Sequence, residues 1–64
     1  GMSVWKLKFE RDLEGLSHQQ LSNIIDYCYE KANSQSGPRY TNGIERDIWK
    51  EKAVMALKKR NSLR

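Results

Sequence analysis

The 64-residue chain contains one cysteine, Cys28, and one histidine, His18. A single cysteine excludes an internal disulfide bond and every metal site built from several thiolates. One histidine adds too few ligands for a structural zinc centre. A chain of this length buries only about 60% of the surface that its unfolded form exposes, so its stability is marginal. Self-association is the remaining common remedy, and we expect a homodimer.

Long apolar runs are also missing, so we expect neither a membrane span nor a secretion signal. Gly1 before Met2 is typical of a scar from a cleaved tag. A lone cysteine without a secretion signal suits a reducing interior and predicts a cytoplasmic protein. The glycines form no phosphate-binding pattern, and the carboxylates are interspersed with bases, as on solvated helix faces. We therefore expect no catalysis, no cofactor and no small-molecule substrate.

Positive charge is concentrated in the second half of the chain. Residues 1–32 carry four lysines and arginines against five carboxylates, a net of −1, whereas residues 33–64 carry eight against three, a net of +5. A small domain with one basic end favours anionic partners, most commonly nucleic acid. The predicted phosphate contacts are Lys6, Lys8, Arg39, Lys58, Lys59, Arg60 and Arg64. The structural alternative is that the last helical turn merely complements the helix dipole.

Two helices joined by a loop account for most of the chain. Ser17 and Gln20 have the spacing of a capping box, and Leu16 and Leu21 have that of a hydrophobic staple. Apolar residues at helical spacing beyond this start predict a helix over residues 18–32. The polar stretch 33–42, with its Gly-Pro step, predicts a loop. A second helix over 43–60 and a basic tail over 61–64 complete the expected single domain, residues 1–64.

The second helix carries two apolar stripes. One contains Ile44, Ile48 and Met55, and the other, well over a quarter-turn away, contains Trp49, Ala53, Ala56 and Leu57. One neighbouring helix covers a single stripe of roughly 100°, so we expect two neighbours. We predict that the Trp49 stripe is a dimer or partner interface. The alternative is that the N-terminal segment of the same chain covers it.

The N-terminal segment fits two patterns. Trp5, Leu7 and Phe9 alternate with charged residues, which favours a strand over residues 4–9. Trp5 and Phe9 also begin a helical series with Leu13 and Leu16, which would give a three-helix bundle. We predict the strand, followed by an antiparallel two-helix hairpin, in a mainly α (small α+β) fold. A single strand cannot satisfy its own backbone, so this choice also predicts pairing with a second chain.

The order of strand, helix, loop and helix, with Lys6 and Lys8 on the polar face of the strand, resembles that of ribbon-helix-helix transcriptional regulators. The resemblance implies a two-chain ribbon in the DNA major groove, with Lys6, Lys8 and Glu10 toward DNA. The chain departs from the family in the seven residues 10–16 before the capped helix and in its longer loop. The similarity covers the element order and no specific motif.

The sequence therefore predicts a small basic nucleic-acid-binding or regulatory protein that acts as a dimer without catalysis. The alternative is a protein-interaction module or accessory subunit with no nucleic-acid affinity, which docks through the Trp49 stripe.

Overall fold

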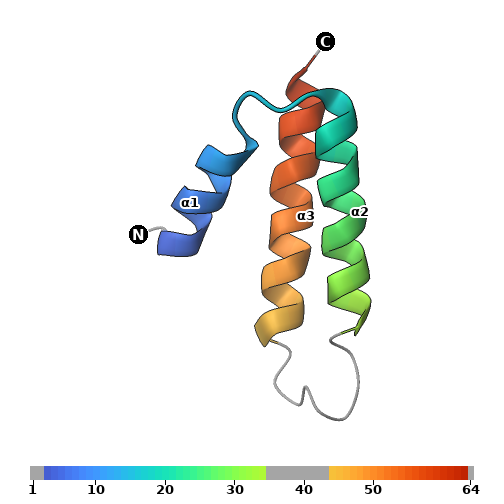
Figure 1. Cartoon of the computed structure of the whole chain (residues 1–64). Helices are drawn as coiled ribbons and strands as arrows, with labels where there is room; N and C mark the ends of the chain where they lie inside the picture. The colour runs from blue at the N-terminus through green and yellow to red at the C-terminus, as the bar shows by residue number, and fades with distance from the viewer. Residues whose placement is uncertain (1–2, 35–43, 64) are drawn as a thin grey trace.

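The computed structural model describes residues 3–34 and 44–63, and this part of the chain forms three helices. They are α1 (Val4–Leu13), α2 (His18–Ser34) and α3 (Ile44–Ser62). Helices α2 and α3 lie side by side and antiparallel as a hairpin, and α1 lies beside α3 (Figure 1). None of the three helices is both long and apolar enough to cross a membrane, as judged from the described residues. The fold is a small helical bundle.

The strand predicted over residues 4–9 is wrong, because these residues belong to helix α1. A helix satisfies its backbone hydrogen bonds within its own segment, so no second chain is required to pair with it. The competing helical pattern places Leu13 in the core, where it is only 2% exposed, with Phe9 packed against the same cluster. The resemblance to ribbon-helix-helix proteins therefore fails at its defining element, and the argument for a dimer from an unpaired strand disappears.

The predicted start of the helix after Ser17 is confirmed in detail. The backbone N–H of Gln20 donates to Ser17 Oγ at 3.2 Å, and the backbone N–H of Ser17 donates to Gln20 Oε1 at 2.8 Å. This reciprocal pair is the capping box. Before it, Gly15 has φ +79°, a left-handed conformation that favours glycine and turns the chain from α1 toward α2.

Both long helices extend two residues beyond their predicted ends. Helix α2 reaches Ser34 rather than residue 32, and α3 reaches Ser62 rather than residue 60. In each last turn a serine hydroxyl donates to the carbonyl three residues earlier, Ser34 to Lys31 and Ser62 to Lys59. These bonds satisfy carbonyl groups that a helix end leaves unpaired. The predicted tail is therefore partly helical, and the rest of the predicted loop, residues 35–42, lies outside the described residues.

The core lies mainly between α2 and α3. Helix α2 buries the apolar side chains at the helical spacing expected from the sequence, namely Leu21, Ile25, Cys28 and Ala32. Helix α3 contributes Ala53 and Ala56, each 0% exposed. Small side chains at these two positions let the backbones of the two helices approach closely, so the larger side chains of α2 fill the space between them.

The fold predicts that two leucines contribute very differently to the free energy of unfolding. Leu21→Ala removes a side chain that is 0% exposed and should lower the free energy of unfolding by about 2–5 kcal/mol. Leu7→Ala is the matched control, because Leu7 is 50% exposed and its loss should cost less than about 0.5 kcal/mol. Urea unfolding followed by circular dichroism measures both. Equal losses in the two variants would contradict the assigned core.

Candidate functional site

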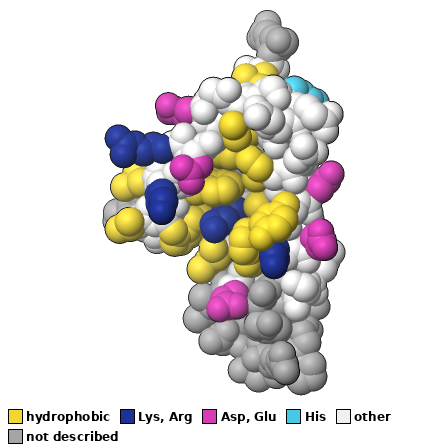
Figure 2. Space-filling model, viewed as in Figure 1, with side chains coloured by type: hydrophobic (Ala, Val, Ile, Leu, Met, Phe, Trp, Pro, Cys, Tyr) yellow, Lys and Arg dark blue, Asp and Glu magenta, His cyan; other side chains and the backbone are white. Residues whose placement is uncertain are grey.

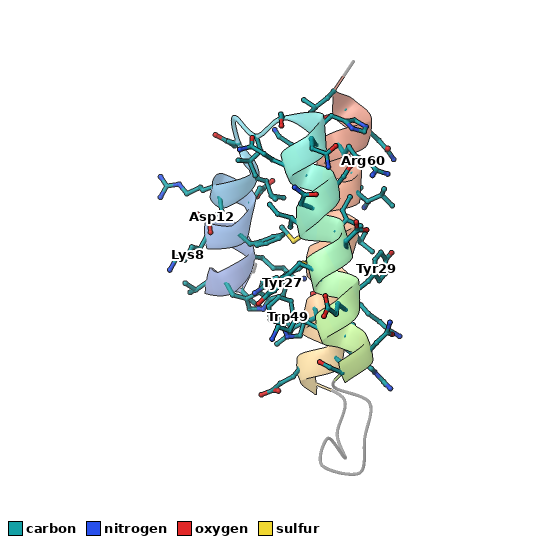
Figure 3. The ribbon with its side chains drawn as sticks, turned by 45° about the vertical axis from the view of Figure 1, so that its right-hand side comes forward. Lys8, Asp12, Tyr27, Tyr29, Trp49 and Arg60 are labelled. Carbon is teal, nitrogen blue, oxygen red and sulfur yellow. The ribbon has the colours of Figure 1, made fainter. Side chains whose placement is uncertain are left out.

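The structure brings three of the predicted phosphate contacts, Lys6, Lys58 and Lys59, to the walls of two adjoining hollows between α1 and α3 and places the other described ones elsewhere. Lys6 is half-buried and forms an ion pair with Glu51, with Nζ 3.3 Å from Oε1. Lys8 is exposed and points away from the bundle on the outer side of α1 (Figure 3). Arg39 and Arg64 lie outside the described residues.

The three cations at the end of α3 also differ from one another. Lys58 is exposed, whereas Lys59 and Arg60 are half-buried. Arg60 Nη1 donates to Ser22 Oγ at 3.0 Å and so joins the end of α3 to the start of α2. Lys59 and Arg60 lie in the last turn, where positive charge complements the helix dipole. The predicted cations therefore differ from one another in exposure and in the groups they contact, and Lys8 lies apart from the others.

The stripe predicted as a partner interface lies largely inside the molecule. Ala53 and Ala56 are fully buried within the single chain, and Leu57 packs against the core cluster. Trp49 is half-buried, and its ring lies 5.6 Å from that of Tyr27, nearly perpendicular to it. The stripe thus meets helix α2 of the same chain, and its two alanines offer no surface to a second protein in this fold.

An ammonium group among aromatic rings joins α1 to α3. Lys52 Nζ lies 4.5 Å from the centre of the Trp49 ring, 5.5 Å from that of Phe9 and 5.7 Å from that of Trp5. Each distance is within the range of a cation–π interaction. On the face of the molecule drawn in Figure 2, hydrophobic side chains gather with lysine or arginine side chains set among them.

This cluster was not predicted from the sequence, because the cluster forms only when residues 4–13 are a helix. As a helix, α1 places Trp5 and Phe9, four residues apart, on one face toward α3. The remaining signal was the spacing of Trp49 and Lys52, three residues apart on α3 and therefore neighbours on the helix surface. With residues 4–9 predicted as a strand, no aromatic side chain of that segment was expected to lie beside Lys52.

A groove runs between α1 and α3, and charged side chains of both signs line it. Two adjoining hollows, of about 290 and 420 Å³, share Glu10, Met55 and Lys58 in their walls. We call them together the α1–α3 groove. Met55 and Val54 on α3 and Leu13 on α1 supply its apolar surface, and Val54 is 44% exposed.

The two sides of the α1–α3 groove carry opposite charges along the half that lies near the C-terminal end of α3. Glu10 and Glu14 line it from α1, and Lys58 and Lys59 line it from α3. Among the described residues none of these four forms an ion pair, in contrast to Lys6 and its partner Glu51 at the other end. The groove thus presents an acidic rim, an apolar strip and a basic rim, with the charges of both rims available to a ligand.

The single cysteine is a core residue. Cys28 is 1% exposed, and burial raises the pKa of its thiol above the ordinary 9.0, while the Lys52 ammonium acts in the opposite direction. A buried neutral thiol is a poor nucleophile. Within residues 3–34 and 44–63, no group of histidine, cysteine and carboxylate side chains is placed to hold a metal ion.

Comparisons with protein-family models, with curated proteins and with solved structures find no match to this chain. The geometry of the α1–α3 groove and of the aromatic cluster is therefore the basis for assigning a function.

The aromatic cluster predicts a specific role for Lys52. Lys52→Met keeps an unbranched apolar side chain but removes the ammonium, and it should lower the free energy of unfolding by about 0.5–2 kcal/mol. Lys50→Met, at an exposed position on the same helix, is the control and should change it by less than about 0.5 kcal/mol. Thermal unfolding followed by tryptophan fluorescence measures both. A Lys52→Met protein as stable as the control would show that the ammonium does not hold α1.

The buried thiol predicts that the stability of the fold depends on pH. The folded chain keeps the Cys28 proton to a higher pH than the unfolded chain does, because burial raises the thiol pKa. This contribution to stability is fully present below the ordinary thiol pKa of 9.0 and is lost as the pH rises above it. The difference in unfolding free energy between the natural chain and Cys28→Ala should therefore shrink between pH 8 and 10, as measured in urea. A constant difference over this range would contradict a buried thiol.

Proposed function

We propose that the protein is a small non-catalytic interaction module that receives an amphipathic helix in the α1–α3 groove. The observation that carries this proposal is the combination of unpaired opposite charges on the two rims with apolar Met55 and exposed Val54 in the walls of the same groove. Helix-in-groove recognition uses an apolar stripe for affinity and flanking charges for orientation. A helix with an apolar seam, basic residues on one flank and acidic residues on the other has the matching chemistry.

The charge pattern also argues against a phosphate-binding groove. The lysines nearest the apolar strip lie across from Glu10 and Glu14, whose carboxylates would repel a phosphate backbone. Proteins that track single strands line a groove with one sign of charge and offer open aromatic faces. Here Lys52 already lies over Trp49, and Lys31 lies over Tyr27, with Nζ 5.5 Å from the ring centre.

Nucleic-acid binding is the second candidate function, favoured by the net charge of +4 and by exposed Lys50 and Lys58 on α3. The two lysines are eight residues apart on one helix, about 12 Å along its axis. Fluorescence-anisotropy titrations of labelled duplex DNA, single-stranded DNA and RNA at about 50 and 200 mM salt test it directly. Binding that weakens steeply with salt, and is lost in Lys50→Gln/Lys58→Gln, would establish this candidate.

The interaction module predicts binding of a designed helix. A labelled synthetic peptide with a leucine seam, lysines on one flank and glutamates on the other should bind with a micromolar dissociation constant by fluorescence anisotropy. A peptide of the same seam with glutamine at every charged position should bind at least about fivefold more weakly, since each rim pair contributes up to about 1 kcal/mol.

A pair of valine variants localises the binding. Val54→Lys places a charge in the groove and should abolish peptide binding. Val4→Lys should have a much smaller effect, because Val4 is 81% exposed and lines a hollow on the outer side of α1 that meets the groove only at Glu10 and Glu14. Equal affinity of the natural chain for both peptides, or equal effects of the two valine variants, would contradict the proposed site.

A further inference from the structure

We propose that the partner in the α1–α3 groove is a second copy of the same chain, bound about a two-fold axis parallel to the groove. This inference rests on the proposed function and names the occupant of the same surface: the second copy meets the groove with its own α1–α3 face in place of a separate amphipathic helix. The occupant follows from the charge pattern, because a face with one acidic rim and one basic rim is complementary to itself in one orientation.

The orientation can be derived from symmetry. When two identical faces meet, the two-fold axis lies in the plane between them. Rotation about an axis parallel to the groove exchanges left and right, so the acidic rim of each copy lies over the basic rim of the other. Rotation about an axis across the groove would place acid over acid and base over base. The charges therefore select the parallel axis.

The levels of the charges along the groove match in this orientation, because rotation about a parallel axis keeps each residue at its own height. Glu10 and Lys58 line the same two hollows, and Glu14 lines one of them with Lys58 and Lys59. Glu10 and Glu14 of one copy thus come level with Lys58 and Lys59 of the other, twice in the dimer. At the opposite end, Lys6 is already neutralised by Glu51 in its own chain.

The apolar residues and the size of the chain favour the same conclusion. Met55 and Val54, which is 44% exposed, line the groove and would be shielded from water by the second copy. A 64-residue domain with alanines at the centre of its hairpin gains stability from additional apolar burial. This surface differs from the predicted Trp49 stripe, whose alanines are already covered by α2.

Charge reversal and mixing test the proposal. The first variant, Glu10→Lys/Glu14→Lys, has two basic rims, and the second, Lys58→Glu/Lys59→Glu, has two acidic rims. Each alone should be monomeric at concentrations where the natural chain is dimeric, by sedimentation equilibrium over about a hundredfold range of concentration. An equimolar mixture should form a heterodimer, because every rim then meets its opposite.

The mixture distinguishes a variant that has lost only its interface from one that has misfolded. Two misfolded variants would not form a dimer when they are mixed. Lys8→Glu/Asp12→Lys reverses charges on another side of α1 and should leave the dimer unchanged (Figure 3). Dimerisation should also weaken when salt is added, because the rim charges are screened.

Two results would overturn the proposal. The first is a natural chain that sediments as a monomer at all concentrations, and the second is a mixture of the two variants that stays monomeric while the natural chain dimerises. If the chain stays monomeric but the designed peptide still binds the groove, self-docking is wrong and the interaction module stands. If neither the peptide nor a second copy binds, both are wrong.

Discussion

The close contact of α2 with the alanines of α3 is the interaction on which the rest of the structure depends. Ala53 and Ala56 are fully buried, and Ala56 forms one core cluster with Leu21 and Ile25 of α2. Because small side chains occupy this side of α3, the two helices pack closely and the larger side chains of α3 are left to face elsewhere. Met55, Lys52 and their neighbours therefore become the surface on which α1 lies.

The attachment of α1 creates the surface to which we assign a function. The Lys52 ammonium among aromatic rings and the Lys6–Glu51 ion pair join α1 to α3. With α1 held by Trp5 and Phe9, its carboxylates come to lie opposite the lysines at the end of α3. A groove with two oppositely charged rims thus results from how α1 is held, and it could not exist on the hairpin alone.

The sequence predicted those parts of the fold that depend on local interactions. The capping box at Ser17 and the apolar stripe of α2 were correct, because both arise from residues three or four positions apart. The prediction for the N-terminal segment was wrong, because the pattern of these six residues fits a strand as well as a helix. Packing against α3 then determines which of the two forms. The groove could not be predicted either, since its rims lie more than forty residues apart in the chain, as Glu10 and Lys58 do. Of the lysines predicted as phosphate contacts, Lys6 pairs with Glu51, and Lys58 and Lys59 line the groove across from Glu10 and Glu14.

The central claim is that the α1–α3 groove is the surface through which two copies of this chain associate. Amide chemical shifts of the ¹⁵N-labelled chain, recorded by NMR during serial dilution, test it most directly, because they identify the affected residues without a chosen partner. The account predicts concentration-dependent shifts centred on Glu10, Val54 and Lys58, with α2 unaffected. Shifts centred on exposed Tyr27 and Tyr29 of α2, or an absence of any change with concentration, would contradict it.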